Sequence, residues 1–435
     1  MKVKKIGLGM ISAALVLAAG CSFAHSSNTG GQEQSSSQQV ELRFSWWGSQ
    51  ERHNRTLKVI ELFEKKYPNI KITGEYSGND GYNDKLAAQI AAGNAPDIMQ
   101  IGGSFLGEYV TRNAILDLTP NVNSKELNTA DFDKGILSSG SYNGKLYGIS
   151  MGNNAWSLML NTEMLKKAGI ALPKENWTWD DFAKLTGEIA SKLGKGYYGA
   201  FYDAGNSNYF DVFLKQRGKI MYKDGQIQFT KDDLTAWFNL WEDLRKKGAV
   251  TPPEVLASNP STPDKSLLIT GKVAIQMDAS NLLTAYQKNT KDGLILLTVP
   301  SGDKGNGQFL RPAQFITAYS KTKHPKETVQ FIDFYINDPE AGQILGNERG
   351  IPESSKIREL LKKDAGPVDL AMYDYSDKIS KVGTGSFTEL MPGFNEFGTL
   401  LKTTSEKISF EQATVPQAVD QLWDDIQKLL SKYKK

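Results

Sequence analysis

The chain has 435 residues, with 51 basic and 49 acidic side chains and a formal net charge of +2. This near-neutral balance gives no electrostatic basis for nucleic-acid binding. A single cysteine excludes intrachain disulfides and cysteine-rich metal clusters, and three histidines leave little for a histidine-based site, so we predict no metal and no cofactor.

Residues 1–20 have the layout of a secretory signal peptide. Three lysines precede the apolar run IGLGMISAALVLAAG, which is shorter than the roughly 20 residues that span a bilayer. The stretch LAAGC resembles the bacterial lipobox, in which the peptide is cut before the cysteine and the thiol is lipidated, so we predict lipidation at Cys21. The alternative is an ordinary cleaved signal with an incidental cysteine. Cleavage would remove three lysines and no acids, which changes the net charge from +2 to −1.

Residues 21–39 are predicted to be the lipidated cysteine and a flexible tether. The stretch SFAHSSNTGGQEQSSSQQ is rich in Ser, Gln and Gly and has too little apolar content to order. The roughly 395 residues that follow exceed one typical hydrophobic core, so we predict two domains.

Alternating strands and helices follow the tether. The predicted strands are VELRFSWW (40–47), IKITGEY (70–76) and the short segment in APDIMQIGG (95–103), and the predicted helices begin after Ser49 and at Tyr82. This order predicts a parallel sheet with right-handed crossovers.

Two adjacent tryptophans, Trp46 and Trp47, end the first predicted strand. Ligands of such sheets bind outside the carboxyl ends of the strands. Because neighbouring residues on a strand point to opposite faces, we expect Trp46 to pack beneath the following helix and Trp47 to lean over a cleft. Gly48 and the N-terminus of that helix would leave backbone donors open to a ligand.

The remainder of the chain continues the α/β pattern and becomes mostly helical towards its C-terminus. The predicted strands lie in NGKLYGISMGNNAWSLMLN (143–161), GYYGAFY (196–202), GKVAIQMD (271–278), GLILLTVPSG (293–302) and FLRPAQFITAYS (309–320). The stretch GKGYYG (194–199) matches a dinucleotide-binding pattern, but it follows a helix and enters a strand, so we interpret it as a helix stop and a turn.

These landmarks resemble the family 1 extracellular solute-binding proteins of bacterial ABC sugar transporters, the group that includes the maltose-binding proteins. The resemblance is carried by FEKKYPNIKI (63–72), AAGNAPDI (91–98), NGKLYGISMGNNAWSLMLNTEMLKKAGI (143–170), WTWDDFAKL (177–185), LLITGKVAIQMD (267–278) and RPAQFITAYSKTKHPKETVQFIDFYIND (311–338). A looser resemblance, in WWGSQERHNRTLKVIELFEKKYP (46–68) and ENWTWDDF (175–182), is to the subgroup that binds pectin- or rhamnogalacturonan-type oligosaccharides.

The resemblance implies an α/β, periplasmic-binding-protein-like fold, with two α/β lobes, a central cleft and a multi-segment hinge. We expect the N-terminal lobe to comprise 40–152 plus 279–313 and the C-terminal lobe 153–278 plus 314–435. The chain would then cross between the lobes near residues 152–156, 276–278 and 311–315.

The resemblance also implies a function. The protein would be a monomeric, non-enzymatic solute-binding protein on the extracytoplasmic face of the cell membrane, held there by its lipid anchor. It would bind a carbohydrate, in particular an oligosaccharide, and deliver it to the membrane permease subunits of an ABC importer. The alternative is a secreted glycoside hydrolase, which needs only two opposed carboxylates.

Sugar rings offer apolar C–H faces and many hydroxyls, so a sugar site combines aromatic plates with polar side chains. The candidate ligand-binding residues are Trp46, Trp47, Ser49, Gln50, Asp80, Tyr82, Gly102, Gly103, Asn153, Asn154, Trp156, Tyr202, Asp203, Asn206, Asp278, Arg311 and Gln314. The alternatives are core packing for the tryptophans, turn formation for the two asparagines near 153, helix capping for Asp278 and a lobe-to-lobe salt bridge for Arg311. Arg52 and His53 are expected to be solvated, although they could meet an acidic sugar.

Overall fold

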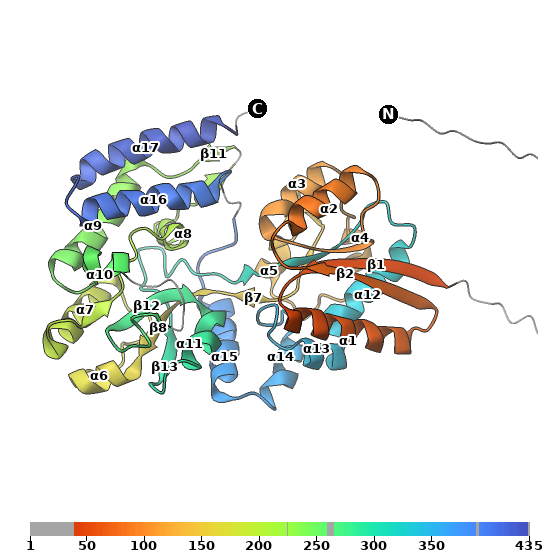
Figure 1. Ribbon diagram of the computed structural model, residues 1–435, viewed down its shortest axis with the longest axis horizontal. Coiled ribbons are helices and arrows are strands. Elements are labelled where there is room, and N and C mark those ends of the chain that lie inside the picture. The colour runs from red at the N-terminus through yellow and green to blue at the C-terminus, as the bar shows by residue number, and fades with distance from the viewer. Residues whose placement is uncertain (1–38, 224, 259–264, 389–390, 434–435) are drawn as a thin grey trace, which may run out of the picture. The chain divides into compact units, whose positions relative to one another are not determined.

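The computed structural model describes residues 39–223, 225–258, 265–388 and 391–433. The predicted signal peptide, Cys21 and the tether up to residue 38 lie outside the described residues. Over the described part, the chain builds two α/β assemblies, each on its own sheet, which we call the first and the second lobe (Figure 1). The predicted fold class is therefore confirmed.

The sheet of the first lobe has the order β2-β1-β3-β15-β6. Its strands are β1 (Val40–Trp47), β2 (Ile70–Ser77), β3 (Ile98–Ile101), β15 (Phe315–Ala318) and β6 (Ile149–Ser150). Strand β1 is parallel to β2 and β3, as predicted, while β15 runs antiparallel to β3 and β6.

Helices cover both faces of the first sheet (Figure 1). One face packs against α1 (Gln50–Lys66) and α12 (Pro325–Asn337). Phe44 and Trp46 of β1 contribute to the core on this side. The opposite face packs against α2 (Tyr82–Ala91) and α3 (Leu106–Thr111), through a second cluster that includes Met99.

The local sequence explains where α1 begins and ends. The Ser49 hydroxyl accepts a hydrogen bond from the Arg52 backbone N–H at 3.2 Å and caps the helix N-terminus. Glu51 in the first turn and Lys65 in the last turn both complement the helix dipole. Pro68, which cannot donate a backbone hydrogen bond, follows the C-cap residue Tyr67.

The sheet of the second lobe has the order β13-β8-β12-β9. Its strands are β8 (Trp156–Asn161), β9 (Tyr198–Ala200), β12 (Val273–Ala279) and β13 (Leu294–Leu297). Strand β12 is parallel to β9 and antiparallel to β8. The main helices around it are α7 (Trp179–Leu193), α8 (Ser207–Gln216), α9 (Lys231–Lys246), α16 (Phe394–Ser409) and α17 (Val415–Ser431).

Short elements complete the described chain. The helices are α4 (Thr119–Asn123), α5 (Lys134–Ser139), α6 (Thr162–Ala168), α10 (Pro253–Ser258), α11 (Leu283–Gln287), α13 (Pro339–Leu345), α14 (Ser355–Lys362) and α15 (Pro367–Val382), with the 3-10 turns Gly103–Phe105 and Ser280–Leu282. The strands are β4 (Ser141–Tyr142), β5 (Lys145–Leu146), β7 (Asn153–Asn154), β10 (Tyr222–Lys223), β11 (Gln226–Ile227) and β14 (Arg311–Pro312).

The strand pairing corrects the predicted lobe boundaries. Strand β13 pairs with β8 of the second lobe, so the stretch 279–313 does not return to the first lobe as expected. Strand β15 pairs with β3 of the first lobe, and α12 packs there too, so 314–435 does not belong wholly to the second lobe. The physical reason is that α11 folds back after β12 and packs against β13, which keeps the chain in the second lobe past Asp278.

Three segments therefore connect the lobes: residues 151–155, residues 311–314 and the stretch between α13 and α15. The short β7–β14 pair joins the first two of these segments. The third is tied to the first because the Asn153 backbone N–H donates to the Ile351 carbonyl at 2.7 Å. The expected crossings at 152–156 and 311–315 agree with this path, and the one at 276–278 is wrong.

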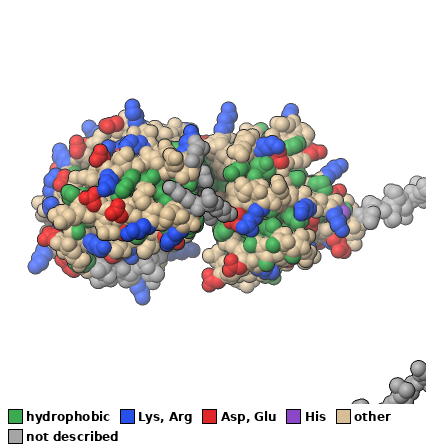
Figure 2. Space-filling view, turned by 90° about the horizontal axis from the view of Figure 1, so that it is seen from above, with side chains coloured by type: hydrophobic (Ala, Val, Ile, Leu, Met, Phe, Trp, Pro, Cys, Tyr) green, Lys and Arg blue, Asp and Glu red, His purple; other side chains and the backbone are tan. Residues whose placement is uncertain are grey.

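Charged side chains of both signs are interspersed over the face seen in Figure 2, as expected for a solvated surface. None of the helices in the described ranges combines the length and the apolar content needed to cross a bilayer.

Candidate ligand-binding site

A hollow of about 910 Å³ opens at one edge of the second sheet. Strands β9 and β12 are parallel, so their carboxyl ends meet at this edge. Tyr202, Asp203 and Asn206 follow β9, and Asp278 lies near the end of β12; all four line the hollow. All four are candidate residues predicted from the sequence, and the structure brings them together. We call this region the second-lobe hollow.

Other walls of the second-lobe hollow consist of residues that were not predicted from the sequence. Helix α16 lies beside α17 and packs on α8 (Figure 1). It brings Asn395, Lys402 and Glu406 to the hollow, while Tyr286 comes from α11. No strand-end pattern marks these residues, because they lie on helices whose position depends on long-range packing.

Asp278 is the best-connected polar group of the hollow. Its Oδ2 accepts a hydrogen bond from the Tyr286 hydroxyl at 2.7 Å, and its Oδ1 accepts from the Ala279 backbone N–H at 2.8 Å. The Gln276 amide donates to the same tyrosine hydroxyl at 2.6 Å. Burial raises the pKa of Asp278, and the hydrogen bond from Tyr286 opposes that shift. The result is a carboxyl group that is held in place and whose oxygens can accept hydrogen bonds, at the carboxyl end of β12.

Asp203 is the second carboxyl of the hollow. Burial, and then the charge of Asp278, raise the pKa of Asp203 to about 8, although Asn206 and the Met277 backbone N–H donate hydrogen bonds to it. Its Oδ2 is buried and has no hydrogen-bond partner among the described residues. At neutral pH the carboxyl is therefore mostly protonated and can donate a hydrogen bond.

Asp203→Asn should raise thermal stability, and the gain should be larger at pH 8 than at pH 5. An acid whose folded pKa lies above its unfolded value loses stability as pH rises through the interval between them, here from about 4 to about 8. The asparagine variant carries no such charge. Thermal unfolding at both pH values checks this, with the exposed Asp303→Asn as the control. An equal gain at both pH values would contradict the protonated state of Asp203.

Tyr202 lines the hollow but turns its hydroxyl away from solvent. The side chain is buried, and its hydroxyl donates to Glu242 Oε1 at 3.0 Å. Only part of its ring can face the hollow. Ligand contact by Tyr202 therefore stays a prediction. Such a contact would involve the ring and not the hydroxyl.

The double tryptophan divides between the two faces of the first sheet, as expected. Trp46 is 0% exposed and lies in the core beneath α1, where its Nε1 donates to His53 Nδ1 at 3.1 Å. Trp46 therefore offers no surface to a ligand. Trp47 is half-buried on the opposite face, with its ring 5.0 Å from that of Tyr82. Its contact with a ligand remains a prediction.

The turn after Trp47 was expected to leave the backbone N–H groups of Gly48 and the helix N-terminus open to a ligand, and the structure differs. The Gly48 N–H donates to the Ser77 carbonyl at 3.1 Å, and the Ser49 side chain caps α1. Arg52 is not solvated: its Nε lies 2.5 Å from Glu348 Oε2, and its Nη1 donates to the Trp47 carbonyl at 3.3 Å. The arginine stem lies against Gly48, where a Cβ would come within 2.2 Å of it.

His53 is also buried rather than solvated, because its ring packs against those of both Trp46 and Tyr76. Burial lowers the pKa of His53, and Arg349 and Arg52 add to that shift. Tyr76, which was not among the predicted site residues, pairs in register with Trp46 and stacks on its ring at 5.1 Å while remaining 44% exposed. The position of Tyr76 at the carboxyl end of the predicted strand 70–76 is the feature of the sequence that could have indicated it.

Several other candidates have structural partners. The Tyr82 hydroxyl donates to the Ser45 and Gln100 carbonyls, and Gln314 donates to the Arg349 carbonyl at 2.8 Å. The Asn153 amide donates to Glu353 Oε2 at 2.7 Å. All three candidate side chains are buried. The candidates with open or partly open positions around the carboxyl edge of the first sheet are Ser49, Gln50, Asp80, Gly102 and Gly103.

Trp156, Asn154 and Arg311 meet where the chain passes between the lobes. Arg311 and Asn154 are opposite each other in the β7–β14 pair. The Arg311 guanidinium carbon lies 4.3 Å from the centroid of the Trp156 ring. Among the described residues no carboxylate forms a salt bridge with Arg311, so the alternative role as a lobe-to-lobe ion pair is wrong.

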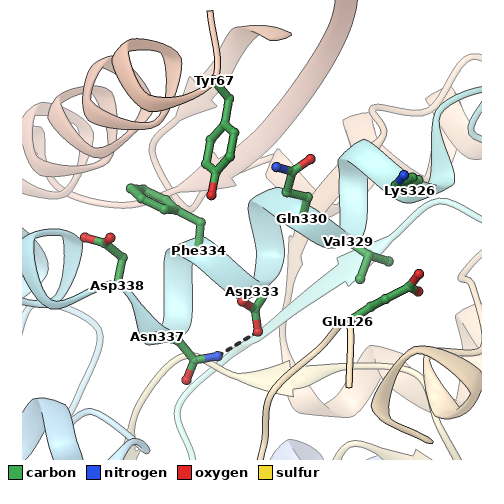
Figure 3. A pocket seen from close by; sticks show the side chains of 9 residues that line it. All are labelled: Tyr67, Glu126, Lys326, Val329, Gln330, Asp333, Phe334, Asn337 and Asp338. Carbon is green, nitrogen blue, oxygen red and sulfur yellow. Dashed lines mark hydrogen bonds between the residues drawn. The ribbon is translucent and has the colours of Figure 1, made fainter. Parts of the chain in front are cut away.

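A second hollow of about 540 Å³ lies on the outer face of α12. Figure 3 shows Tyr67, Phe334 and Asn337 around it, with Asn337 donating to Asp333. It contains none of the predicted ligand-binding residues. Tyr67 precedes β2, so this hollow lies towards the amino end of that strand, the opposite edge from the one where such sheets bind ligands.

The two-lobed α/β fold and the strand-end hollow define a solute-binding protein. The chain matches the family described as bacterial extracellular solute-binding protein over residues 58–350, and it belongs to that family. The predicted family resemblance is thus confirmed, and the family is one of binding proteins.

Solved structures and a curated relative show similarity beyond the family match. A family 1 extracellular solute-binding protein of Alicyclobacillus acidocaldarius has a TM-score of 0.81 and 28% identity, covering 90% of this chain and 98% of its own. A periplasmic oligogalacturonide-binding protein of Yersinia enterocolitica has a TM-score of 0.77 and 26% identity, covering 90% and 99%. The arabinooligosaccharide-binding protein of Bacillus subtilis is 26% identical over 226 residues, or 51% of each chain.

Proposed function

We propose that this protein captures an oligosaccharide between its lobes, with the second-lobe hollow as the main site, and delivers it to the permease of an ABC importer. The observation that carries the proposal is the convergence of Asp203, Asn206 and Asp278 at the joint carboxyl edge of β9 and β12. Two relatives whose names state an oligosaccharide ligand support the same class.

The chemistry of the hollow suits sugar hydroxyls. Asp278 offers a fixed acceptor, protonated Asp203 a donor, and Asn206 an amide at the start of α8. The ring of Tyr286 adds an apolar edge. A sugar needs both hydrogen bonds and apolar contacts, since hydroxyl groups surround the apolar C–H faces of its ring. Closure of the lobes over the ligand would follow because the closed state makes more contacts with it.

The test is a thermal-shift screen over neutral and acidic oligosaccharides, followed by calorimetric titration of each hit. We expect at least one oligosaccharide to bind with a dissociation constant near the micromolar range, which corresponds to about 8 kcal/mol. Asp278→Ala should weaken that binding. A screen in which sugars leave the melting temperature unchanged while another class of solute raises it would contradict the proposal.

The paired carboxyls Asp203 and Asp278 also raise the question of hydrolysis, because glycosidases use two carboxylates. We expect no bond cleavage, since the family consists of binding proteins. Incubation with plant oligosaccharides, followed by chromatography of the products, distinguishes hydrolysis from binding without cleavage. Products that disappear in Asp278→Asn would establish an enzyme.

Lipid anchoring at Cys21 gives a separate prediction. If LAAGC is a lipobox, the mature chain begins at Cys21 and remains with the membrane fraction. Cys21→Ser should release the protein into the soluble fraction or leave it uncleaved, because the thiol that carries the lipid is gone. Fractionation and intact mass spectrometry measure both. Membrane retention of the wild type with a free Cys21 thiol would show that the motif is incidental.

A further inference from the structure

Glu353 is a buried acid at the point where the three connecting segments meet. It lies two residues after Ile351 on the third segment and is 3% exposed. Its Oε1 lies 2.6 Å from the Ser150 hydroxyl, just before the first segment, and its Oε2 accepts from the Asn153 amide of that segment at 2.7 Å. The Ser376 hydroxyl of α15 donates to Asn153 Oδ1 at 2.8 Å and so holds that amide in place. Glu353 therefore joins the third connecting segment to the first through side chains, in addition to the backbone pair of Asn153 and Ile351.

The second connecting segment joins the same arrangement through Gly152. The Gly152 carbonyl accepts a hydrogen bond from the Ser150 hydroxyl at 2.9 Å and another from the Ala313 backbone N–H at 2.8 Å. One chain of hydrogen bonds thus runs from Glu353 through Ser150 and Gly152 to Ala313. It includes residues of all three connecting segments.

This chain of hydrogen bonds needs a protonated carboxyl group. A serine hydroxyl has one proton to donate, and a backbone carbonyl can only accept. When the Ser150 proton is donated to the Gly152 carbonyl, the 2.6 Å contact is a hydrogen bond only if Glu353 Oε1 carries a proton and donates it to the serine oxygen. An ionised Glu353 would instead compete with the Gly152 carbonyl for that one proton.

The surroundings of Glu353 also favour the neutral acid. Within the described ranges no basic side chain forms an ion pair with it. Burial raises the pKa of Glu353 to about 8, although the hydrogen bonds that it accepts lower it. Arg358 of α14 favours the charged form, but its guanidinium pairs with Asp377 of α15 at 3.1 Å, and Asp133 at the N-terminus of α5 disfavours it. The carboxyl group is therefore mostly protonated at neutral pH.

We propose that Glu353 is a positioning residue of the hinge: as a neutral acid it holds the three connecting segments in one arrangement, and its ionisation loosens them. A buried carboxylate without a paired cation is costly, so the segments that enclose it open more readily when it is charged. Because these segments join the lobes, their opening changes how firmly the lobes are held relative to each other. The inference concerns the hinge and does not depend on the identity of the solute.

The direction of the pH dependence follows from this arrangement. An acid whose folded pKa lies above its unfolded value loses stability as pH rises through the interval between them, here from about 4 to about 8. Glu353→Gln has the shape of the neutral acid and an N–H donor for Ser150, but it cannot ionise. The variant should therefore behave like the wild type near pH 5 and hold the connecting segments more firmly than the wild type at pH 9.

The test is hydrogen–deuterium exchange of the full chain and of Glu353→Gln, compared with each other at pH 5 and again at pH 9. Because each comparison is made at one pH, the intrinsic exchange rates cancel, and so does the titration of Asp203, which both proteins carry. At pH 9 we expect peptides that cover 151–155, 311–314 and 346–353 to exchange at least roughly tenfold faster in the wild type. At pH 5 the same peptides should agree within a few-fold, and peptides of β8 and β12 should agree at both pH values.

Ser150→Ala is the matched control. It removes the hydroxyl that bridges Glu353 and Gly152 in either charge state of the acid, so the connecting segments should exchange faster than in the wild type already at pH 5. A binding measurement with the oligosaccharide found in the screen adds a functional readout. The wild type should lose several-fold more affinity between pH 5 and pH 9 than Glu353→Gln, because a loosened hinge must be ordered again when the lobes close. Only this last readout rests on the proposed function.

The outcomes separate the hinge from the function of the protein. Equal exchange of wild type and Glu353→Gln in the connecting segments at pH 9, or a difference of the same size at both pH values, would overturn the proposed ionisation of Glu353. Faster wild-type exchange at pH 9 in β8 and β12 as well would assign the effect to global stability and overturn the role in the hinge. If oligosaccharides do not bind, the proposed function fails and the exchange result on the hinge still stands. If Glu353→Gln does not fold, exchange of the connecting segments relative to β8 and β12 in the wild type, corrected for the intrinsic rate at each pH, still decides.

Discussion

Trp46→Ala should lower the free energy of unfolding by about 3–5 kcal/mol, the usual cost of truncating a fully buried aromatic side chain. The ring lies in the core between β1 and α1, 4.9 Å from the ring of Phe44 and 5.1 Å from that of Tyr76. Its removal would leave a cavity and would take the hydrogen-bond donor from His53 Nδ1. Urea denaturation of the wild type and the variant measures the difference.

Two matched variants separate the causes of this loss. Trp46→Phe keeps most of the apolar volume and loses only the indole N–H, so it should cost clearly less than the alanine variant. Trp47→Ala removes a half-buried ring from the opposite face of the same strand and should also cost less. If Trp47 stacks on a sugar, its truncation should instead weaken ligand binding roughly ten- to hundredfold, or about 1–3 kcal/mol. A larger stability loss for Trp47→Ala than for Trp46→Ala would contradict the assignment of the two faces.

The contrast between these tryptophans shows what local sequence can predict. The period of two along a strand fixes which neighbours share a face, so the separation of Trp46 from Trp47 followed from β1 alone. The parallel order of β1, β2 and β3 followed from the strand–helix alternation. Because the carboxyl ends of parallel strands share an edge, Asp203 and Asp278 can be placed at one site from the sequence alone.

The errors have a common origin in long-range pairing. Strand β13 is the four-residue stretch Leu294–Leu297, and β15 is the equally short Phe315–Ala318. Such short apolar strands are compatible with the sheet of either lobe. Only their pairing with antiparallel partners determines the lobe to which each belongs. The contribution of α16 to the hollow depends in the same way on how a distant helix packs on α8.

The interaction partners of individual side chains also could not be predicted from the sequence. Arg52 and His53 are polar residues in the first turn of a helix, which is typical of solvated positions. The structure buries both because the loop after α13 brings Glu348 and Arg349 against them. Conversely, Arg311 could have formed a salt bridge between the lobes, and its stacking on Trp156 depends on the pairing of β7 with β14. Neither arrangement leaves a periodic signal.

Asp278→Asn should weaken binding of the oligosaccharide found in the screen by about 1–1.5 kcal/mol, or roughly five- to twelvefold. The reason is that a hydrogen bond from a ligand hydroxyl to a charged acceptor is worth about 1.5–3 kcal/mol, whereas the amide keeps a neutral one worth about 0.5–1.5 kcal/mol. The fold should not suffer at neutral pH. Asp203 is mostly protonated at neutral pH, so the substitution removes one buried charge and, among the described residues of this edge, leaves no other without a partner.

Tyr286→Phe is the matched control for Asp278→Asn. It removes the 2.7 Å hydrogen bond that fixes the Asp278 carboxylate but keeps the carboxylate itself, so its affinity should fall by less than that of Asp278→Asn. Calorimetric titration of both variants, with thermal unfolding in the absence of ligand, separates recognition from stability. Unchanged affinity in Asp278→Asn, or a larger loss in Tyr286→Phe, would place the ligand away from the carboxyl end of β12. The site would then have to be sought on the first lobe, at the edge where Trp47 and Asp80 lie.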